Sequence, residues 1–203
     1  MLNAFYKTHN YLVEHVRVPA RRVLMDEINW SDRLIAIKGG RGVGKTDFLL
    51  NYAKEMRVKN PELAKHTLYV NLSDFYFTEH TLVELAAEFV AGGGQVLLID
   101  QAYKYPNWSR ELAQCYYRYP NLRIVFIATA VMRVVEDNKD IGHIVRPYNL
   151  RGFSFREYLN VTLGLKLPVY TLEDILKNHV EIAQQISRHI KPLDYFNDYL
   201  HHG

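Results

Sequence analysis

The 203-residue sequence has a single cysteine, no long apolar run and little net charge. Its one thiol, Cys115, excludes an internal disulfide and is typical of proteins kept in a reducing cytoplasm. No apolar run is long enough to cross a bilayer, and residues 1–16 mix polar and apolar side chains without the apolar core of a signal peptide. We therefore expect a cytoplasmic protein that has no membrane partner.

Charge and histidine spacing exclude two further kinds of site. The formal net charge of +3 is too small to favour a nucleic-acid partner. Nine histidines occur without an HExxH pattern or another tight ligand spacing, so the sequence predicts no zinc site. Hydrophobic residues at 48% are ordinary for a globular protein, and the length suits one α/β domain with a small appended lobe.

The most informative segment is residues 39–46, Gly-Gly-Arg-Gly-Val-Gly-Lys-Thr, which fits the phosphate-binding loop pattern GxxxxGK[ST]. Glycines let the backbone curl so that several N–H groups face phosphate oxygens. The ammonium of Lys45 can lie against the β- and γ-phosphates, and the hydroxyl of Thr46 can bind Mg²⁺. The predicted phosphate-binding residues are Gly39, Gly40, Arg41, Gly42, Val43, Gly44, Lys45, Thr46 and Asp47.

The segments around this loop predict a doubly wound α/β fold, that of a P-loop NTPase. An apolar strand before the loop, 34–38, and an amphipathic helix after it, 45–57, place the loop at a helix N-terminus, which favours anions. Further runs of Val, Ile and Leu alternate with helical stretches and indicate parallel strands buried on both faces. The other predicted strands are 67–72, 95–100, 123–128 and 144–150, and the other helices of the sheet domain are 81–91, 109–118 and 131–137.

Helices are also predicted on either side of these strands in the sequence. Because the pattern changes to helices alone after the last strand, we expect a nucleotide-binding domain over residues 1–150 and a helical lobe over 151–203. The additional predicted helices are 4–15, 20–28, 171–189 and 192–200, and one more begins at the capping-box pair Ser154 and Glu157.

The second half of a nucleotide site is predicted at Asp100. Residues 96–100, Val-Leu-Leu-Ile-Asp, put an acid at the carboxyl end of a buried strand, where ligands bind in open α/β sheets and where P-loop ATPases hold Mg²⁺. Gln101 follows where such enzymes commonly have Glu, and an amide can position water but cannot accept its proton. We therefore expect slow hydrolysis, with Lys45, Asp100, Gln101 and Thr129 as the catalytic set and Thr46 and Asp100 as the metal ligands.

Thr129 ends the fourth predicted strand, beside the expected γ-phosphate edge. Its hydroxyl can contact the γ-phosphate or the attacking water, and it can equally cap the helix predicted after it. Adenine is the expected base, because Asn138-Lys139-Asp140 is one residue short of the guanine-reading NKxD pattern and no DxxG motif follows the second strand. Residues 28–30, just before the first strand, are a candidate for contact with the adenine.

Three motifs occur in sequence order: the loop at 39–46, Lys-Tyr-Pro-Asn-Trp at 104–108 and Ser-Phe-Arg-Glu-Tyr at 154–158. In this combination the chain resembles a group of archaeal and bacterial AAA-type ATPases of the AAA+ and STAND-like kind. The resemblance implies an ATP-binding module that uses ATP and Mg²⁺ through Lys45, Thr46 and Asp100. It also implies a molecular switch or motor that binds ATP and ADP. A protein partner and an oligomer are both compatible with the resemblance.

The resemblance further implies that residues 151–203 begin a lid region, and that the chain is a truncated piece or a module working alone, since members of the group continue into a C-terminal domain. Departures from the group pattern are Gln101, the Ile-Ala-Thr-Ala of residues 127–130 and Asp47. The candidates for an arginine finger are Arg146 and Arg151, which are alternatively ordinary surface charges.

Three other functions stay open. The first is a nucleotide-responsive interaction protein that does not hydrolyse ATP, which Gln101 favours. The second is a small-molecule kinase, which would need an acceptor pocket and an arginine-rich lid. The third is a nucleic-acid translocase, which would need binding that depends steeply on salt.

Overall fold

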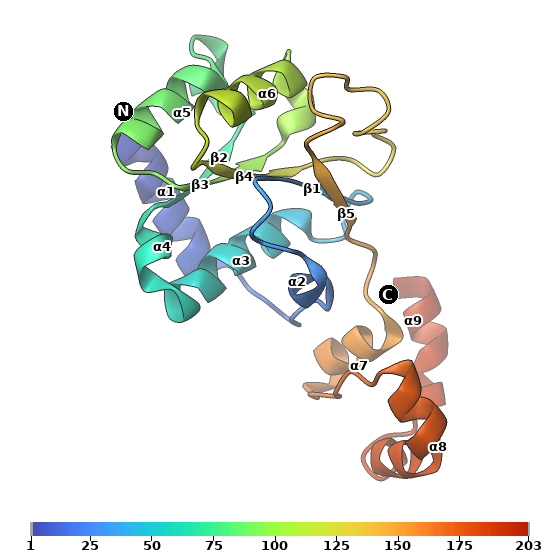
Figure 1. Cartoon of the computed structure of the whole chain (residues 1–203). Helices are drawn as coiled ribbons and strands as arrows, with labels where there is room; N and C mark the ends of the chain where they lie inside the picture. Colours follow the sequence, from blue (N-terminus) through green and yellow to red (C-terminus); the bar gives the residue numbers. More distant parts are fainter. Residues whose placement is uncertain (1, 203) are drawn as a thin grey trace. The chain divides into compact units, whose positions relative to one another are not determined.

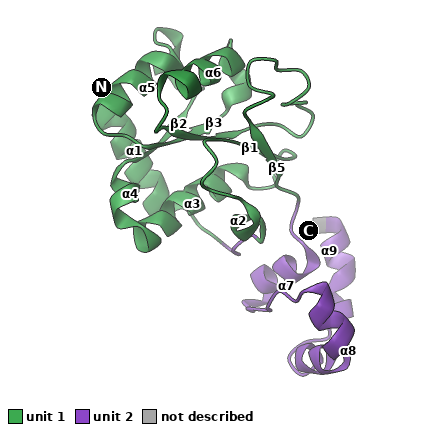
Figure 2. Cartoon of the chain, in the orientation of Figure 1, with its two compact units in different colours: residues 1–18, 23–151 green, residues 19–22, 152–203 purple. Residues whose placement is uncertain are grey.

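The computed structural model describes residues 2–202, and for His202 the backbone alone. The chain divides into two compact units (Figure 2). The first unit comprises the residues up to Val18 together with Val23–Arg151, and the second comprises Pro19–Arg22 together with the residues from Gly152 on. Every helix within the described residues is too short or too polar to span a lipid bilayer.

The first unit is built on a five-stranded parallel sheet in the order β2-β3-β4-β1-β5 (Figure 1). Strand β4 therefore lies between β1, which precedes the phosphate-binding loop, and β3, which ends in Asp100. The predicted strands and the α/β P-loop fold are confirmed, with strand ends that differ by one or two residues. The strands are β1 (Leu34–Lys38), β2 (Thr67–Asn71), β3 (Val96–Asp100), β4 (Arg123–Ile127) and β5 (Arg146–Asn149).

Two hydrophobic clusters cover the two faces of the sheet, which explains why the inner strands are apolar throughout. Side chains alternate along a strand, so Leu34 belongs to one cluster and Ile35 to the other. Helices α5 and α6 pack on the first face, where Cys115 of α6 is fully buried, and α3 packs on the second (Figure 1). The helices of this unit are α1 (Leu2–His15), α2 (Leu24–Glu27), α3 (Lys45–Lys59), α4 (Pro61–Lys65), α5 (Leu82–Ala91) and α6 (Trp108–Arg118), with short 3₁₀ turns η1 (Phe75–Thr78) and η2 (Ala102–Lys104).

Helix α1 covers the outer edge of the sheet. Strand β2 is an edge strand, and the outward N–H groups of an edge need partners. The N–H of Tyr69 donates to Nδ1 of His9 on α1 at 3.0 Å. Burial of His9, which is 3% exposed, and the nearby charge of Arg57 lower its pKa to about 4. The ring is therefore neutral at pH 7, as an acceptor at Nδ1 requires.

The predicted helix over residues 131–137 is wrong, because the described chain between β4 and β5 forms turns. The side-chain amide of Asn138 donates to the carbonyl oxygen of Val134 at 3.3 Å and competes with helical hydrogen bonds. Gly142 approaches the same turn so closely that a Cβ there would lie 2.3 Å from the carbonyl oxygen of Val135. A local side-chain bond and a glycine contact therefore fold this segment back on itself.

One other predicted helix is too long, and one short helix was not predicted. Of the predicted helix over 20–28, only the four residues of α2 are helical. Helix α4 was missed, although Asn60 and Pro61 gave a local signal for it: the Asn60 side chain accepts from the N–H of Leu63, and proline occupies the first turn. One turn of helix is too short to show the apolar periodicity on which the other predictions depended.

The second unit contains no strand within its described residues. The Arg22 Nε donates to Glu157 Oε1 at 3.3 Å, and the guanidinium lies 4.7 Å from the centre of the Phe153 ring. Glu157 also completes the predicted capping box with Ser154. The helices of this unit are α7 (Phe155–Leu163), α8 (Leu172–Ser187, with a break at Asn178), η3 (Pro192–Tyr195) and α9 (Phe196–His202).

Candidate functional site

The loop of residues 39–46 connects the carboxyl end of β1 to the N-terminus of α3. Gly42 and Gly44 have φ values of 85° and 83°, in the left-handed region that glycine enters without strain. At Gly39 a Cβ would lie 2.5 Å from the carbonyl oxygen of Leu150. The glycine spacing of the motif is therefore required by backbone geometry, and it leaves the loop free to curl around an anion.

Lys45 folds back over the loop. Its Nζ donates to the carbonyl oxygens of Gly39 at 2.9 Å and Gly40 at 2.6 Å. Burial lowers the pKa of Lys45, and the negative charge of Asp100 acts in the opposite direction. A polyphosphate would supply stronger, charged acceptors for the same ammonium.

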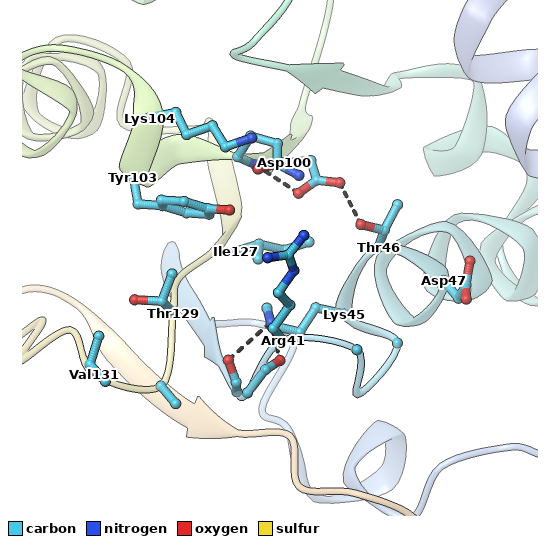
Figure 3. A pocket seen from close by; sticks show the side chains of 16 residues that line it. Arg41, Lys45, Thr46, Asp47, Asp100, Tyr103, Lys104, Ile127, Thr129 and Val131 are labelled. Carbon is cyan, nitrogen blue, oxygen red and sulfur yellow. Dashed lines mark hydrogen bonds between the residues drawn. The ribbon is translucent and has the colours of Figure 1, made fainter.

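Asp100 and Thr46 meet across the pocket. The Thr46 hydroxyl donates to Asp100 Oδ2 at 2.6 Å, although the two residues come from different elements, α3 and β3 (Figure 3). The Tyr69 hydroxyl donates to the same oxygen at 2.9 Å, and the N–H of Gln101 donates to Oδ1 at 2.7 Å. Asp100 is 2% exposed, so these bonds compensate for the burial of its charge.

These oxygen groups fit Mg²⁺, a hard cation that prefers carboxylate, hydroxyl and water ligands. Within residues 2–202, no group of three or more His, Cys, Asp or Glu side chains could hold a metal by itself. Protein sites of Mg²⁺ commonly use one or two carboxylates and take their remaining ligands from substrate phosphates and water. Thr46 and Asp100 therefore match a metal that arrives with a phosphate rather than a metal held by the protein alone.

A cavity of about 780 Å³ opens above the loop. Three cations line it, Arg41, Lys45 and Lys104, against the two carboxylates of Asp47 and Asp100, so a polyanion meets an excess of positive charge. Figure 3 shows the Arg41 side chain extending from the loop into this space. The other lining residues are Gly39, Gly40, Gly42, Gly44, Thr46, Gln101, Tyr103, Ile127, Thr129, Ala130 and Val131.

Gln101 and Thr129 both line this cavity. Gln101 has φ 56°, an uncommon value for a residue other than glycine, and its Oε1 is buried with no hydrogen-bond partner among the described residues. Thr129 donates its N–H to the sulfur of Met132 at 3.4 Å. Because turns replace the helix predicted after Thr129, the alternative in which this residue caps that helix is wrong.

Asp47 lies at the first turn of α3 and lines the cavity, where its carboxyl group is in part shielded from solvent. Partial burial raises the pKa of its carboxyl group. An acid at this position is compatible with the positive end of the helix dipole, as well as with a place near the phosphates.

The candidates for base contact and for an arginine finger are not among the residues that line the cavity. The Trp30 ring stacks on Tyr52 at 3.6 Å between centroids, and its Nε1 donates to the carbonyl oxygen of Met25. Arg146 begins β5 and pairs in register with Ile35, at the amino end of the sheet, whereas the loop leaves the carboxyl end. Neither Arg146 nor Arg151 is among the cavity-lining residues.

Three residues of the site were missed by sequence reasoning. Tyr103 and Lys104 follow Asp100 closely, and Lys104 opens the Lys-Tyr-Pro-Asn-Trp stretch, so the sequence did offer a signal for them. Tyr69 is 31 residues before Asp100 in the chain and is brought to it only by the pairing of β2 with β3. A tyrosine in the middle of a buried strand was the one available signal, and it does not point to Asp100 by itself.

A family model described as "AAA domain" matches residues 31–159. A search of the curated proteins finds no match. The chain is similar to domain III of the replication initiation protein DnaA from Thermotoga maritima, at 15% identity and a TM-score of 0.49, over 87% of this chain and 76% of that one.

Two further solved structures are similar at comparable levels. AMPPCP-bound DnaA from Aquifex aeolicus is 14% identical with a TM-score of 0.43, over 92% of this chain and 60% of that one. PCH-2 from C. elegans is 17% identical with a TM-score of 0.44, over 83% of this chain and 50% of that one. The chain thus spans half the length of the PCH-2 chain.

Proposed function

Because the chain belongs to the AAA domain family, whose members are AAA-type P-loop ATPases and thus ATP-binding modules, we propose that it binds ATP with Mg²⁺ and hydrolyses it slowly. The observation that supports this most directly is the 2.6 Å hydrogen bond between Thr46 and Asp100 at the base of a cation-lined cavity. It brings the hydroxyl of the phosphate-binding loop and the acid of β3 to one point, where both can reach a single cation.

Each side chain has a distinct task in this proposal. The loop N–H groups and Lys45 bind the β- and γ-phosphates, and Arg41 and Lys104 add positive charge to the lining of the cavity. Thr46 and Asp100 hold Mg²⁺, which when bound neutralises phosphate charge. ADP binds through the same groups after hydrolysis, with one phosphate fewer to contact.

Slow hydrolysis follows from Gln101. Its amide can orient a water molecule but cannot accept the proton of that water, and general-base assistance contributes about 10²–10⁴-fold in rate. Thr129 lines the cavity and is our candidate for contact with the γ-phosphate or the water. Adenine is the proposed base, in a part of the site to which no residue is assigned.

The wider organisation is also proposed from the sequence motifs. We place the nucleotide-binding domain at residues 1–150 and the start of a lid at 151–203, as in the group of AAA-type ATPases with the Lys-Tyr-Pro-x-Trp and Ser-Phe-Arg-Glu-Tyr motifs. In this proposal the protein is cytoplasmic. Other subunits of an oligomer, or a protein partner, recognise the nucleotide-bound state.

A second function is favoured by the same glutamine: a switch that binds ATP and does not hydrolyse it. Binding of ATP would then shift the chain between two conformations, and a partner would recognise one of them. The two functions differ only in turnover, because they use the same phosphate and metal contacts.

Nucleotide binding is tested by calorimetric titration of ATP with and without Mg²⁺ into the wild-type chain, Lys45→Ala and Lys59→Ala. Lys59 is the matched control, because it lies on the same helix and its exposed ammonium pairs with Glu55. We expect Lys45→Ala to weaken ATP binding by about 10-fold or more, since it removes a charge-assisted contact, and Lys59→Ala to bind normally. Unchanged binding by a folded Lys45→Ala chain would contradict the site.

Turnover is tested by single-turnover hydrolysis with protein in excess over MgATP, for the wild-type chain and Gln101→Glu. A wild-type chain that hydrolyses ATP at a measurable rate supports the slow ATPase. An inert wild-type chain beside an active Gln101→Glu variant supports the switch, with one amide keeping the site in a binding-only state.

A further inference from the structure

Tyr69 is the one residue outside the phosphate-binding loop and β3 whose side chain bonds to Asp100 within the described residues. Its hydroxyl lies 2.9 Å from Asp100 Oδ2, the oxygen that also accepts from Thr46. Tyr69 is 4% exposed and belongs to the hydrophobic cluster between the sheet and α3. The bond is therefore shielded from water, which strengthens it relative to a surface contact.

The backbone of Tyr69 is held in place on both sides of strand β2, in addition to the hydrogen bond of its hydroxyl group. On one side, β2 pairs with β3, with Tyr69 opposite Leu98. On the other side, its N–H donates to the buried ring of His9. A side chain anchored in this way brings its hydroxyl to Asp100 in one orientation.

The direction of the hydrogen bond is also fixed. A carboxylate oxygen has no proton to give, so the Tyr69 hydroxyl is the donor and Asp100 Oδ2 is the acceptor. Without this hydroxyl, Oδ2 would keep only Thr46 as a donor, and Thr46 is itself a proposed metal ligand. The carboxylate would then be oriented mainly by the Gln101 N–H at its other oxygen.

We propose that Tyr69 is a positioning residue of the magnesium site, whose hydroxyl holds the Asp100 carboxylate where it and Thr46 can share one cation. The inference rests on the proposed function, since it assumes that the site binds Mg²⁺ together with ATP. Groups that orient metal ligands in this way typically change metal affinity by about 10–100-fold when they are removed.

Tyr105 offers a matched control. It is also a buried tyrosine, 8% exposed, and its hydroxyl donates to the carboxylate of Glu111 at 3.0 Å and accepts from the N–H of Leu82 at 3.3 Å. Neither Tyr105 nor Glu111 lines the cavity, although the neighbouring Lys104 does. Tyr105→Phe therefore removes the same kind of tyrosine–carboxylate bond, together with the contact to Leu82. It reports what the loss of a buried tyrosine–carboxylate contact does to the fold alone.

The experiment is a Mg²⁺ titration of nucleotide binding, followed with a fluorescent ATP analogue, for the full chain, Tyr69→Phe and Tyr105→Phe. We expect Tyr69→Phe to raise the Mg²⁺ concentration for half-maximal binding by about 10-fold or more. Metal-free binding in EDTA is expected to stay unchanged. Tyr105→Phe is expected to match the wild-type chain in both measurements, with a melting temperature lowered about as much as that of Tyr69→Phe.

Two outcomes would overturn the inference alone: equal Mg²⁺ dependence in the wild-type chain and Tyr69→Phe, or equal shifts in the two variants, which would indicate a structural role. A wild-type chain that binds nucleotide with no dependence on Mg²⁺ would overturn the metal part of the proposed function, and the inference with it. The three results are distinguishable because the first compares the wild-type chain with Tyr69→Phe, the second compares the two variants, and the third compares the wild-type chain with and without Mg²⁺.

Discussion

The two units differ in what keeps their helices folded. In the first unit, α5 buries Leu82 and Leu85 against the sheet, at 0% and 1% exposure. In the second, α8 has sixteen residues and buries none of its described side chains. The break at Asn178 divides α8 into two segments, each shorter than the roughly 12–15 residues below which an isolated helix is marginal in water. The order of the sheet unit therefore comes from packing, whereas α8 depends on its cap and on contacts along its own length.

The largest expected difference is between two leucine-to-alanine changes. Leu85→Ala should lower the free energy of unfolding by about 2–5 kcal/mol, because it leaves a cavity in the core. Leu176 of α8 is 72% exposed, and Leu176→Ala should change stability by less than about 0.5 kcal/mol. Urea unfolding checks this, by fluorescence of Trp30 and Trp108, both in the first unit, and by circular dichroism for the helices. Equal losses would mean that α8 is packed as tightly as the core.

A second difference concerns pH, since the first unit holds His9 buried and neutral. Its pKa is about 4 in the folded chain against an ordinary value of 6.5, so between these values the unfolded chain binds more protons. Stability should therefore fall as the pH falls from 6.5 to 4, by about 3 kcal/mol in total. The measurement is urea unfolding as a function of pH.

His9→Asn isolates this effect from the titration of carboxylates. The Asn oxygen can still accept the N–H of Tyr69, but it does not titrate. The wild-type chain should lose stability relative to the variant over that pH range, and the difference should level off below pH 4. A constant difference across the range would show that His9 is protonated at no cost.

The smallest expected effect compares two capping boxes of the same kind. Thr81 caps α5 in the first unit, and Thr171 caps α8 in the second. Replacing either by alanine should cost about 1 kcal/mol. For Thr81→Ala the loss should appear in global unfolding, because α5 is part of the core. For Thr171→Ala it should appear as faster hydrogen exchange confined to α8, and a matching loss in the tryptophan-detected transition would contradict the comparison.

The sequence predicted those parts of the molecule whose signals are local. The strands were found because buried parallel strands are continuous runs of apolar residues, and the loop because residues 39–46 meet strict backbone requirements at Gly42 and Gly44. Residues 131–137 were predicted as a helix, whereas their turns depend on a close contact between Gly142 and the carbonyl oxygen of Val135.

The parts that escaped prediction depend on contacts between distant segments. Tyr69 was invisible as a site residue because its partner is fixed by the order of strands in the sheet. The register of β5 puts Arg146 at the amino end of the sheet, a position that its place in the sequence did not reveal. Sheet order and register, rather than residue type, decide which side chains meet.

The burial of Cys115 has a practical consequence for studying the two units. Burial raises the pKa of its thiol to about 12, so at pH 7 only roughly one thiol in 10⁵ is the reactive thiolate. Alkylating dyes should therefore leave the native protein unlabelled. Cysteines introduced at one exposed site in each unit would then be the only attachment points, and fluorescence energy transfer between two dyes could follow the distance between the units as nucleotide is added, without any change to the natural thiol.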